Sequence, residues 1–389
     1  MPADTAHLRL AKFHAPEIVF GPGSRFEAAG AATRLGARHP FLVTDAGLTE
    51  AGWGAELHTH LIDNDLRPTM WSDVTPNPKD HEIEAGYGKY MASGCDVIVA
   101  LGGGSAIDAA KGIAVLAANG GSILDYEGVD RIHGPIPPLV MLPSTAGTGA
   151  DVSQFCIVTD TTRRTKITIM GRALVPDISM VDPALLTTVP RWLAAASGLD
   201  ALTHGIEAFV SRAHNPLTDN HALQSIALVG ENLVRTVDDP AEETARVFMA
   251  QAALEAGLAF TNAILGAAHA MSHQVGGLLD LPHGVINGVL LPHVVRFNAL
   301  GDPRRFVPIA QALGLPVNGV PAEEAALHVA DAVRNLADEV GVPKGLAEIG
   351  VSEGDVAQLA ELTMADACLS TNPRAATVDE VAELFRVAL

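Results

Sequence analysis

Five residues in the second half of the chain pair carboxylate and imidazole groups at spacings that suit a metal site. Asp200 and His204 lie four residues apart in a segment with a helical pattern, and His269 and His273 repeat that spacing. Because residues i and i+4 share one face of a helix, each pair would project its side chains together. His283 follows shortly after the second pair. A carboxylate with several imidazoles suits a divalent first-row metal such as Fe²⁺ or Zn²⁺.

The alternative for each histidine is a hydrogen-bonded core residue, which is the commoner role of a single histidine on an apolar helix. The chain has 15 histidines, so some pairs at helical spacing are expected by chance. These five residues, however, lie in the most apolar stretches of the second half, where an unpaired polar group is costly. We therefore favour a metal site, although the spacing does not say which four of the five residues are its ligands.

A run of glycines in the first half has the character of a phosphate-binding loop. Gly102, Gly103, Gly104 and Ser105 follow a strand-like segment and precede a helical pattern that carries Asp108. Glycines let backbone N–H groups approach a pyrophosphate, and a helix N-terminus favours its negative charge. The spacing is not that of the G-x-G-x-x-G fingerprint, so a simple tight turn is the alternative.

A second loop and one aspartate extend this interpretation. Thr145-Ala146-Gly147-Thr148-Gly149 also follows a strand-like segment, and its small and hydroxyl side chains suit a cofactor, although a surface turn is the alternative. Asp45 ends another such segment, where a carboxylate can bind a ribose 2′-hydroxyl and would repel a 2′-phosphate. Asp45 as a helix N-cap is the competing interpretation. Taken together, the loops predict nucleotide binding, with NAD favoured over NADP.

The two halves of the chain have different patterns of secondary structure. The first half alternates helical patterns with short apolar segments, which predicts a parallel sheet covered on both faces. From about residue 191 onward, long Ala/Leu-rich segments have helical spacing and we expect no strands. We therefore predict an α/β dinucleotide-binding domain over residues 1–188 and a helical metal-binding domain over residues 189–389. The expected strands are Glu17–Phe20, Phe41–Thr44, Thr69–Trp71, Asp96–Leu101 and Leu139–Leu142, and the expected helices include Ala106–Leu116, Trp192–Ser211, Pro216–Val234, Glu242–Phe260 and Ala322–Val340.

The charge balance narrows the classes of partner. The chain has 45 acidic and 25 basic residues, a formal charge of −20, so nucleic acid and anionic membrane surfaces should repel it. We see no uninterrupted apolar run of the roughly 20 residues needed to cross a bilayer. Three widely spaced cysteines favour a reducing compartment. Asp4, His7, Arg9 and Lys12 precede any apolar run, which is unlike a signal peptide. We expect a cytoplasmic protein.

Several segments, taken together, match the pattern of one known family from end to end. They are Glu17–Phe20 with Gly21-Pro22-Gly23, Gly102–Lys111, Thr145–Gly149, Lys166-Ile167, Gly198–His204, His269–Gly284, Cys368 and Asn372-Pro373-Arg374. In these segments the chain resembles the iron-containing (group III) alcohol dehydrogenases. Within that family it is similar to the lactaldehyde/propanediol reductases, partly because Cys368 falls where that group also has a cysteine.

The resemblance implies roles for individual residues. It implies that Asp200, His204, His269 and His283 are the metal ligands, and that His273 lies near the nicotinamide as a proton-relay or positioning residue. The implied cofactor contacts are Asp45, Gly102, Gly103, Gly104, Ser105, Asp108, Thr145, Thr148 and Lys166. The family often has glutamate where this chain has Asp151, so we assign Asp151 no role.

The resemblance further implies a dehydroquinate synthase-like fold with the site in the cleft between its two domains, and a homodimer. It implies a metal-dependent, NAD(H)-linked dehydrogenase of small primary alcohols, or reductase of their aldehydes, with iron or zinc as the metal. A glycerol dehydrogenase or a maleylacetate reductase of related fold is the alternative enzyme, and a non-catalytic metal- or nucleotide-binding protein is the alternative class. By position, Phe155, Phe260, Asn262 and Cys368 are candidates to line the substrate pocket.

Overall fold

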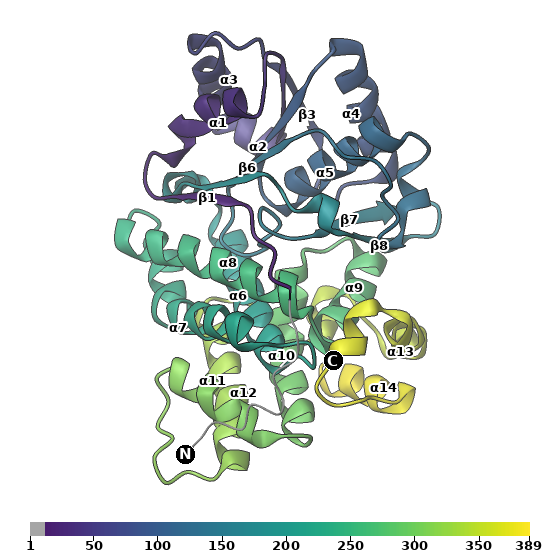
Figure 1. Ribbon diagram of the computed structural model, residues 1–389. Coiled ribbons are helices and arrows are strands. Elements are labelled where there is room, and N and C mark those ends of the chain that lie inside the picture. The colour runs from purple at the N-terminus through teal and green to yellow at the C-terminus, as the bar shows by residue number, and fades with distance from the viewer. Residues whose placement is uncertain (1–11) are drawn as a thin grey trace.

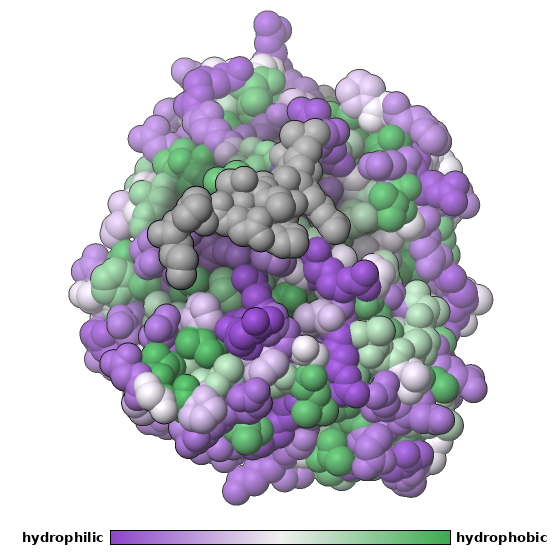
Figure 2. Space-filling view, turned by 60° about the horizontal axis from the view of Figure 1, so that its bottom comes forward, coloured by the Kyte–Doolittle hydropathy of each residue, from purple (hydrophilic) through white to green (hydrophobic). Residues whose placement is uncertain are grey.

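The computed structural model describes residues 12–389, so the N-terminal charges Asp4, His7 and Arg9 lie outside the described residues. An α/β layer forms the upper part of the molecule and a group of helices the lower part (Figure 1). The predicted combination of a parallel sheet and a helical second half is confirmed. Polar and apolar side chains are interspersed over the visible face of the helical end (Figure 2).

The central sheet has six strands, all paired in parallel, in the order β1-β9-β6-β4-β2-β3. The strands are β1 (Glu17–Phe20), β2 (Pro40–Asp45), β3 (Thr69–Val74), β4 (Val97–Gly102), β6 (Leu139–Pro143) and β9 (Ile178–Val181). Five of them are the predicted strands, with no end shifted by more than three residues. The sixth, β9, is only four residues long and lies between prolines, and we did not predict it.

Alternation along β4 explains why helices cover both faces of the sheet. Val97, Val99 and Leu101 pack in one hydrophobic cluster with α1 (Ala28–Arg34) and α3 (Trp53–Asp63). The intervening Ile98 and Ala100 pack in another cluster, with α4 (Asp80–Ser93) and α5 (Gly104–Asn119). Successive strand residues point to opposite faces, so an apolar run without breaks is buried on both.

A second, small sheet was not predicted. Its strands are β5 (Gly128–Val129), β8 (Thr165–Met170) and β7 (Phe155–Asp160), and β7 and β8 are antiparallel. Their connection places Arg164 at φ 54°, a conformation that turn signals normally assign to glycine or asparagine. Because the turn lacks those residues, the sequence carried no signal for a hairpin at this position. The hairpin positions Lys166, on β8, for which the resemblance implies a cofactor contact.

The helical half is built from α6 (Arg191–Val210), α7 (Pro216–Asp238), α8 (Glu243–Ala263), α9 (Ala267–Leu279), α10 (His283–Ala299), α11 (Phe306–Ala312), α12 (Ala322–Glu339), α13 (Val356–Ala365) and α14 (Val378–Val387). The predicted helices in this half are confirmed, with ends within about one turn. One hydrophobic cluster of mostly alanine, leucine and valine runs through them. Across residues 12–389, no single helix has the length and apolar composition to cross a bilayer, and only α8 and α9 together, bent by 102°, meet those criteria.

Candidate active site

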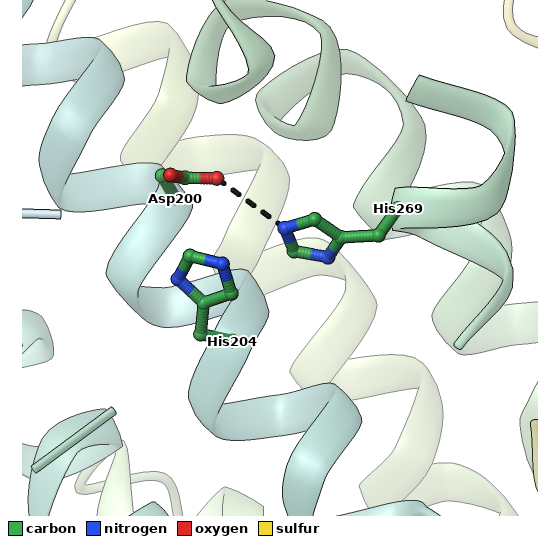
Figure 3. Close-up of side chains that lie close together, drawn as sticks. All are labelled: Asp200, His204 and His269. Atoms are coloured by element: carbon green, nitrogen blue, oxygen red, sulfur yellow. Dashed lines mark ion pairs between the residues drawn. The ribbon is translucent and has the colours of Figure 1, made fainter. Parts of the chain in front are cut away.

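Three of the five predicted polar residues meet in one buried cluster. Asp200 and His204 project from successive turns of α6, and His269 reaches them from α9 (Figure 3). One candidate ligand atom from each lies within 4.8 Å of the others. His269 Nε2 is 3.5 Å from Asp200 Oδ1, and the His204 and His269 rings stack with centroids 4.5 Å apart. The i, i+4 spacing on α6 therefore does what the sequence predicted.

A further shell of polar groups orients these side chains. His269 Nδ1 donates to Glu207 Oε2 at 2.7 Å, and the Ala268 backbone N–H donates to the other carboxylate oxygen at 2.6 Å. Asn287 Nδ2 donates to Asp200 Oδ1 at 2.8 Å. The sequence analysis missed Glu207 and Asn287. A signal was present for Glu207, because it lies seven residues after Asp200 and therefore on the same face of α6.

The protonation of the cluster suits a cation. Burial would raise the pKa of Asp200, but His204, His269 and Asn287 lower it to about 2. Burial lowers the pKa of His204 to about 4. Burial would also lower the pKa of His269, but its two carboxylate neighbours raise it to about 9. Within the described chain, Asp200 and Glu207 form ion pairs with His269 and with no arginine or lysine. The raised pKa means that His269 holds a second proton, which a bound metal would displace. The buried carboxylates and the neutral imidazole of His204 fit a divalent metal.

His283 lies beside this cluster, not within it. It begins α10, and its Nδ1 accepts a hydrogen bond from Lys166 Nζ at 3.1 Å. Its ring centroid is 5.0 Å from that of His273. The next residue, Gly284, permits the close approach of α10 to α6, since a Cβ there would lie 2.0 Å from the Ala196 carbonyl oxygen. The structure thus places His283 next to His273 and Lys166. It lies outside the cluster of Asp200, His204 and His269.

The two glycine-containing loops lie side by side at the carboxyl ends of neighbouring strands. Gly102 pairs with Pro143 where β4 and β6 end. A Cβ at Gly103 would lie 3.2 Å from Thr145 Cγ2, and one at Gly104 would lie 3.0 Å from Thr148 Cγ2. Open parallel sheets bind ligands at this edge. Thr145 Oγ1 is buried without a hydrogen-bond partner among residues 12–389, so the loops fit a bound polar group.

The other predicted cofactor residues differ in their hydrogen-bond partners and in their burial. Asp45 Oδ1 accepts from Leu48 N at 3.0 Å and caps α2 (Ala46–Glu50), so the N-cap interpretation is correct for that oxygen. Ser105 Oγ accepts from Asn77 N at 3.0 Å. Asp108 is buried, and burial raises its pKa to about 7. Lys166 Nζ donates to Asn77 Oδ1 at 2.7 Å, and burial lowers its pKa to about 7.

Of the four residues proposed by position for the pocket, Phe155 and Phe260 lie beside His204 and Asn262 does not. Cys368 is buried next to Asp366. The Phe260 ring stacks on His204 at 4.4 Å, and Phe155 packs against Phe260 at 5.9 Å. Asn262 instead uses its amide to bind both backbone polar groups of His14. Asp151, to which we gave no role, accepts from Ser179 Oγ at 2.6 Å and so ties the second loop to β9.

Two family models match consecutive parts of the chain. The model described as iron-containing alcohol dehydrogenase matches residues 15–183, and the model of the C-terminal part of the Fe-containing alcohol dehydrogenase family matches residues 194–389. The chain belongs to the iron-containing alcohol dehydrogenase family. Its membership confirms the resemblance stated from sequence motifs, and makes it an oxidoreductase of the alcohol dehydrogenase class. The expected iron and NAD dependence is confirmed at the level of the family.

Curated members of the iron-containing alcohol dehydrogenase family match nearly the whole chain. A 1,3-propanediol dehydrogenase of Citrobacter freundii is 39% identical over 383 residues, covering 98% of this chain and 99% of the relative. An NAD-dependent methanol dehydrogenase of Bacillus methanolicus is 37% identical, with 97% and 99% covered. The lactaldehyde reductase of Escherichia coli K12 is 33% identical, with 95% and 97% covered.

A solved structure of the same family has the same fold throughout. The crystal structure of a 1,3-propanediol oxidoreductase superposes with a TM-score of 0.95 at 38% identity, covering 98% of this chain and 100% of that one. The similarity to propanediol and lactaldehyde reductases that the sequence motifs indicated is therefore confirmed.

Proposed function

We propose that this protein interconverts small primary alcohols and their aldehydes with NAD(H), using a divalent metal held by Asp200, His204, His269 and His283. The observation that carries the proposal is the contact between the two candidate sites. His204 Nδ1 donates to the Gly147 carbonyl oxygen at 3.2 Å, so a metal ligand touches the second nucleotide loop directly. The relatives named for propanediol, methanol and lactaldehyde support this substrate class.

The reaction moves a hydride from the carbinol carbon to the nicotinamide and a proton from the hydroxyl group to solvent. When bound, the metal supplies a Lewis acid for the substrate oxygen. Backbone N–H groups of Gly102, Gly103 and Gly104 would hold the pyrophosphate at the start of α5. The aromatic wall formed by Phe155 and Phe260 would exclude water from the reacting carbon. His273 would accept the hydroxyl proton and pass it outward.

The remaining predicted contacts complete the cofactor site. Thr145, with its unpartnered hydroxyl, Thr148 and Ser105 would bind phosphate and ribose oxygens beside the glycines. Asp108, on α5, is buried and Lys166, on β8, is partly buried, and both would set the charge near the cofactor. Of the two metals, iron has the support of the family, and zinc remains an outcome to be tested.

One experiment tests the proposed function directly. Elemental analysis of the purified protein should find about one iron or zinc per chain, and a panel of alcohols and aldehydes should show NAD(H) turnover with small primary compounds. Preference for glycerol with bound zinc would indicate the glycerol dehydrogenase alternative. Full activity without metal would indicate the maleylacetate reductase alternative. Bound metal and NAD without turnover of any compound would indicate a binding protein.

Removing the charge of Asp45 is expected to weaken the preference for NAD. Asp45→Gly should lower the ratio of kcat/KM for NAD to that for NADP about tenfold, because a carboxylate repels the 2′-phosphate. The glycine also removes the side-chain cap of α2, which costs only about a few tenths of a kcal/mol. Asp45→Asn separates the charge from the cap, because it keeps a capping oxygen and removes only the charge, and it should weaken the preference for NAD to a similar extent. Equal use of both cofactors by the unmodified protein would contradict this role.

We also propose a cytoplasmic homodimer, without nucleic-acid or membrane partners. The free thiols of Cys95, Cys156 and Cys368 support a reducing compartment, and the charge of −20 disfavours anionic partners. The domain boundary stays a prediction between residues 188 and 189, which is supported by the family models that match on either side of it.

The edge of the sheet supports the dimer. β1 is an outermost strand of the described sheet, and Ile18 and Phe20 are 36% and 40% exposed on it. Such an edge can pair with a second copy. Ile18→Lys combined with Phe20→Lys should shift the mass measured by light scattering from dimer to monomer. Ile62→Lys, which alters an exposed apolar residue of α3, should leave the dimer intact, and a dimer that survives the double substitution would place the interface elsewhere.

A further inference from the structure

The polar cluster around His273 contains a carboxylate to which no role has been given. Asp366 follows α13 and precedes the short 3-10 helix η9 (Ala367–Thr371), and it approaches α9 from the C-terminal part of the chain. His273 Nδ1 lies 2.9 Å from Asp366 Oδ2. The Asp366 side chain is only 12% exposed and that of His273 only 8%. The pair is therefore largely shielded from solvent, on the side of His273 away from its free Nε2.

Both oxygens of Asp366 are held in place. Oδ1 accepts from the Cys368 backbone N–H at 2.9 Å, and Oδ2 accepts from Gln274 Nε2 at 3.2 Å in addition to His273. Burial would raise the pKa of Asp366, but His273 and the hydrogen bonds from Cys368 hold it below its usual value, so the carboxylate is ionised. An ionised carboxylate only accepts hydrogen bonds, and this fixes which ring nitrogen of His273 carries the proton.

The consequence concerns the other ring nitrogen. With Nδ1 donating to Asp366, neutral His273 keeps an unprotonated Nε2 that can accept a proton. The ring itself stands beside the metal cluster, with its centroid 5.0 Å from that of His283 and 6.1 Å from that of His269. The carboxylate would also stabilise the imidazolium formed when Nε2 is protonated. A buried aspartate plays this part for the general base of hydrolytic triads.

We infer that Asp366 is a positioning residue that orients His273 and sets its tautomer for proton transfer. The inference rests on the proposed function, in which His273 accepts the hydroxyl proton. The observation that points to Asp366 is the division of its hydrogen bonds. Oδ2 accepts from His273, while Oδ1 accepts from the backbone of η9. Two competing roles for Asp366 are a purely structural cap of η9 and a ligand of a second metal ion. The second role arises because single atoms of His273, Asp366 and Cys368 lie within 4.8 Å of one another.

Asp366→Asn separates the orienting role from the capping role. The amide oxygen can still cap η9, but the amide N–H₂ would face Nδ1 and favour the tautomer with the proton on Nε2. We expect kcat to fall at least tenfold, with KM for NAD and the metal content unchanged. Asp366→Glu should recover part of kcat. Asp302→Asn makes the same change at the N-cap of η6 (Pro303–Arg305), away from His273; it should leave kcat within about twofold and serves as the matched control.

A double-mutant cycle distinguishes failure of the inference from failure of the proposed function. In a His273→Asn background, Asp366→Asn should cause no further loss of kcat, because its effect acts through the ring. Equal losses in both backgrounds would overturn the inference and leave a structural role. If His273→Asn alone leaves kcat unchanged, His273 relays no proton, and both the relay and the inference fail while the dehydrogenase assignment stands.

A spectroscopic readout checks the tautomer without any turnover. In the zinc-loaded protein labelled with ¹⁵N-histidine, the His273 resonances, assigned through the His273→Asn variant, should show a protonated Nδ1 and an unprotonated Nε2. Asp366→Asn should move the proton to Nε2. An unchanged tautomer would overturn the inference, as would two metal ions per chain in the unmodified protein of which one is lost in Asp366→Asn.

Discussion

Replacing His283 with alanine should abolish tight metal binding and lower kcat about a thousandfold. A Lewis acid at the substrate oxygen contributes several kcal/mol to the transition state, and each 1.36 kcal/mol changes the rate about tenfold. The measurement is metal content by elemental analysis after dialysis, together with kcat for a small primary alcohol. Added metal should restore little activity, because the variant lacks one of its four proposed ligands.

Among substitutions of the four proposed ligands, the geometry makes His283→Ala the most informative. Asp200, His204 and His269 already form a compact buried group, whereas His283 is hydrogen-bonded to Lys166. A three-residue site would keep its metal when His283 is lost, and an active, metal-loaded His283→Ala protein would show that the fourth ligand is wrongly assigned. His328→Ala on α12 is the matched control, since that histidine is 38% exposed and interacts only loosely with Glu324. It should change neither metal content nor kcat.

The second large effect is expected at Glu207, which contacts the proposed metal ligand His269 and is not itself a proposed ligand. Its two oxygens accept from His269 Nδ1 and from the Ala268 N–H, and both groups are buried. A carboxylate behind a ligating histidine fixes the ring and raises its basicity, and losing such a partner typically costs about 10–100-fold in metal affinity. Glu207→Gln should therefore weaken the dissociation constant for Zn²⁺, measured by chelator competition, by that factor.

A second carboxylate–imidazole pair in the same domain provides the control. Glu255 on α8 accepts from His221 Nδ1 outside the proposed metal site, in a partly buried setting. Glu255→Gln should leave the dissociation constant for Zn²⁺ unchanged while removing a comparable interaction. If both variants weaken metal binding equally, the effect reflects general loosening of the helical domain, and Glu207 has no special part in orienting His269.

The sequence predicted the elements that are long or strongly patterned. The buried strands were readable because apolar residues ran without interruption into glycine or proline, and the long helices were readable from their spacing. The strand β9 was missed because Ser179 interrupts its short apolar run and prolines lie close to both of its ends. The hairpin of β7 and β8 was missed because the turn at Arg164 lacks the usual residues. That hairpin carries Lys166, so its contact with His283 was also beyond the sequence.

By itself, the sequence determined that Asp200 and His204 share a helix face and that two small-residue loops follow buried strands, because both conclusions depend only on local periodicity. Tertiary structure alone decided which distant residues complete the site. The approach of α9 to α6 brings His269 against Glu207, and the approach of α10 to α6 brings Asn287 against Asp200. The turn after α13 brings Asp366 to His273. These contacts join segments 62, 87 and 93 residues apart, and the packing of helices, which no local pattern encodes, sets such distances.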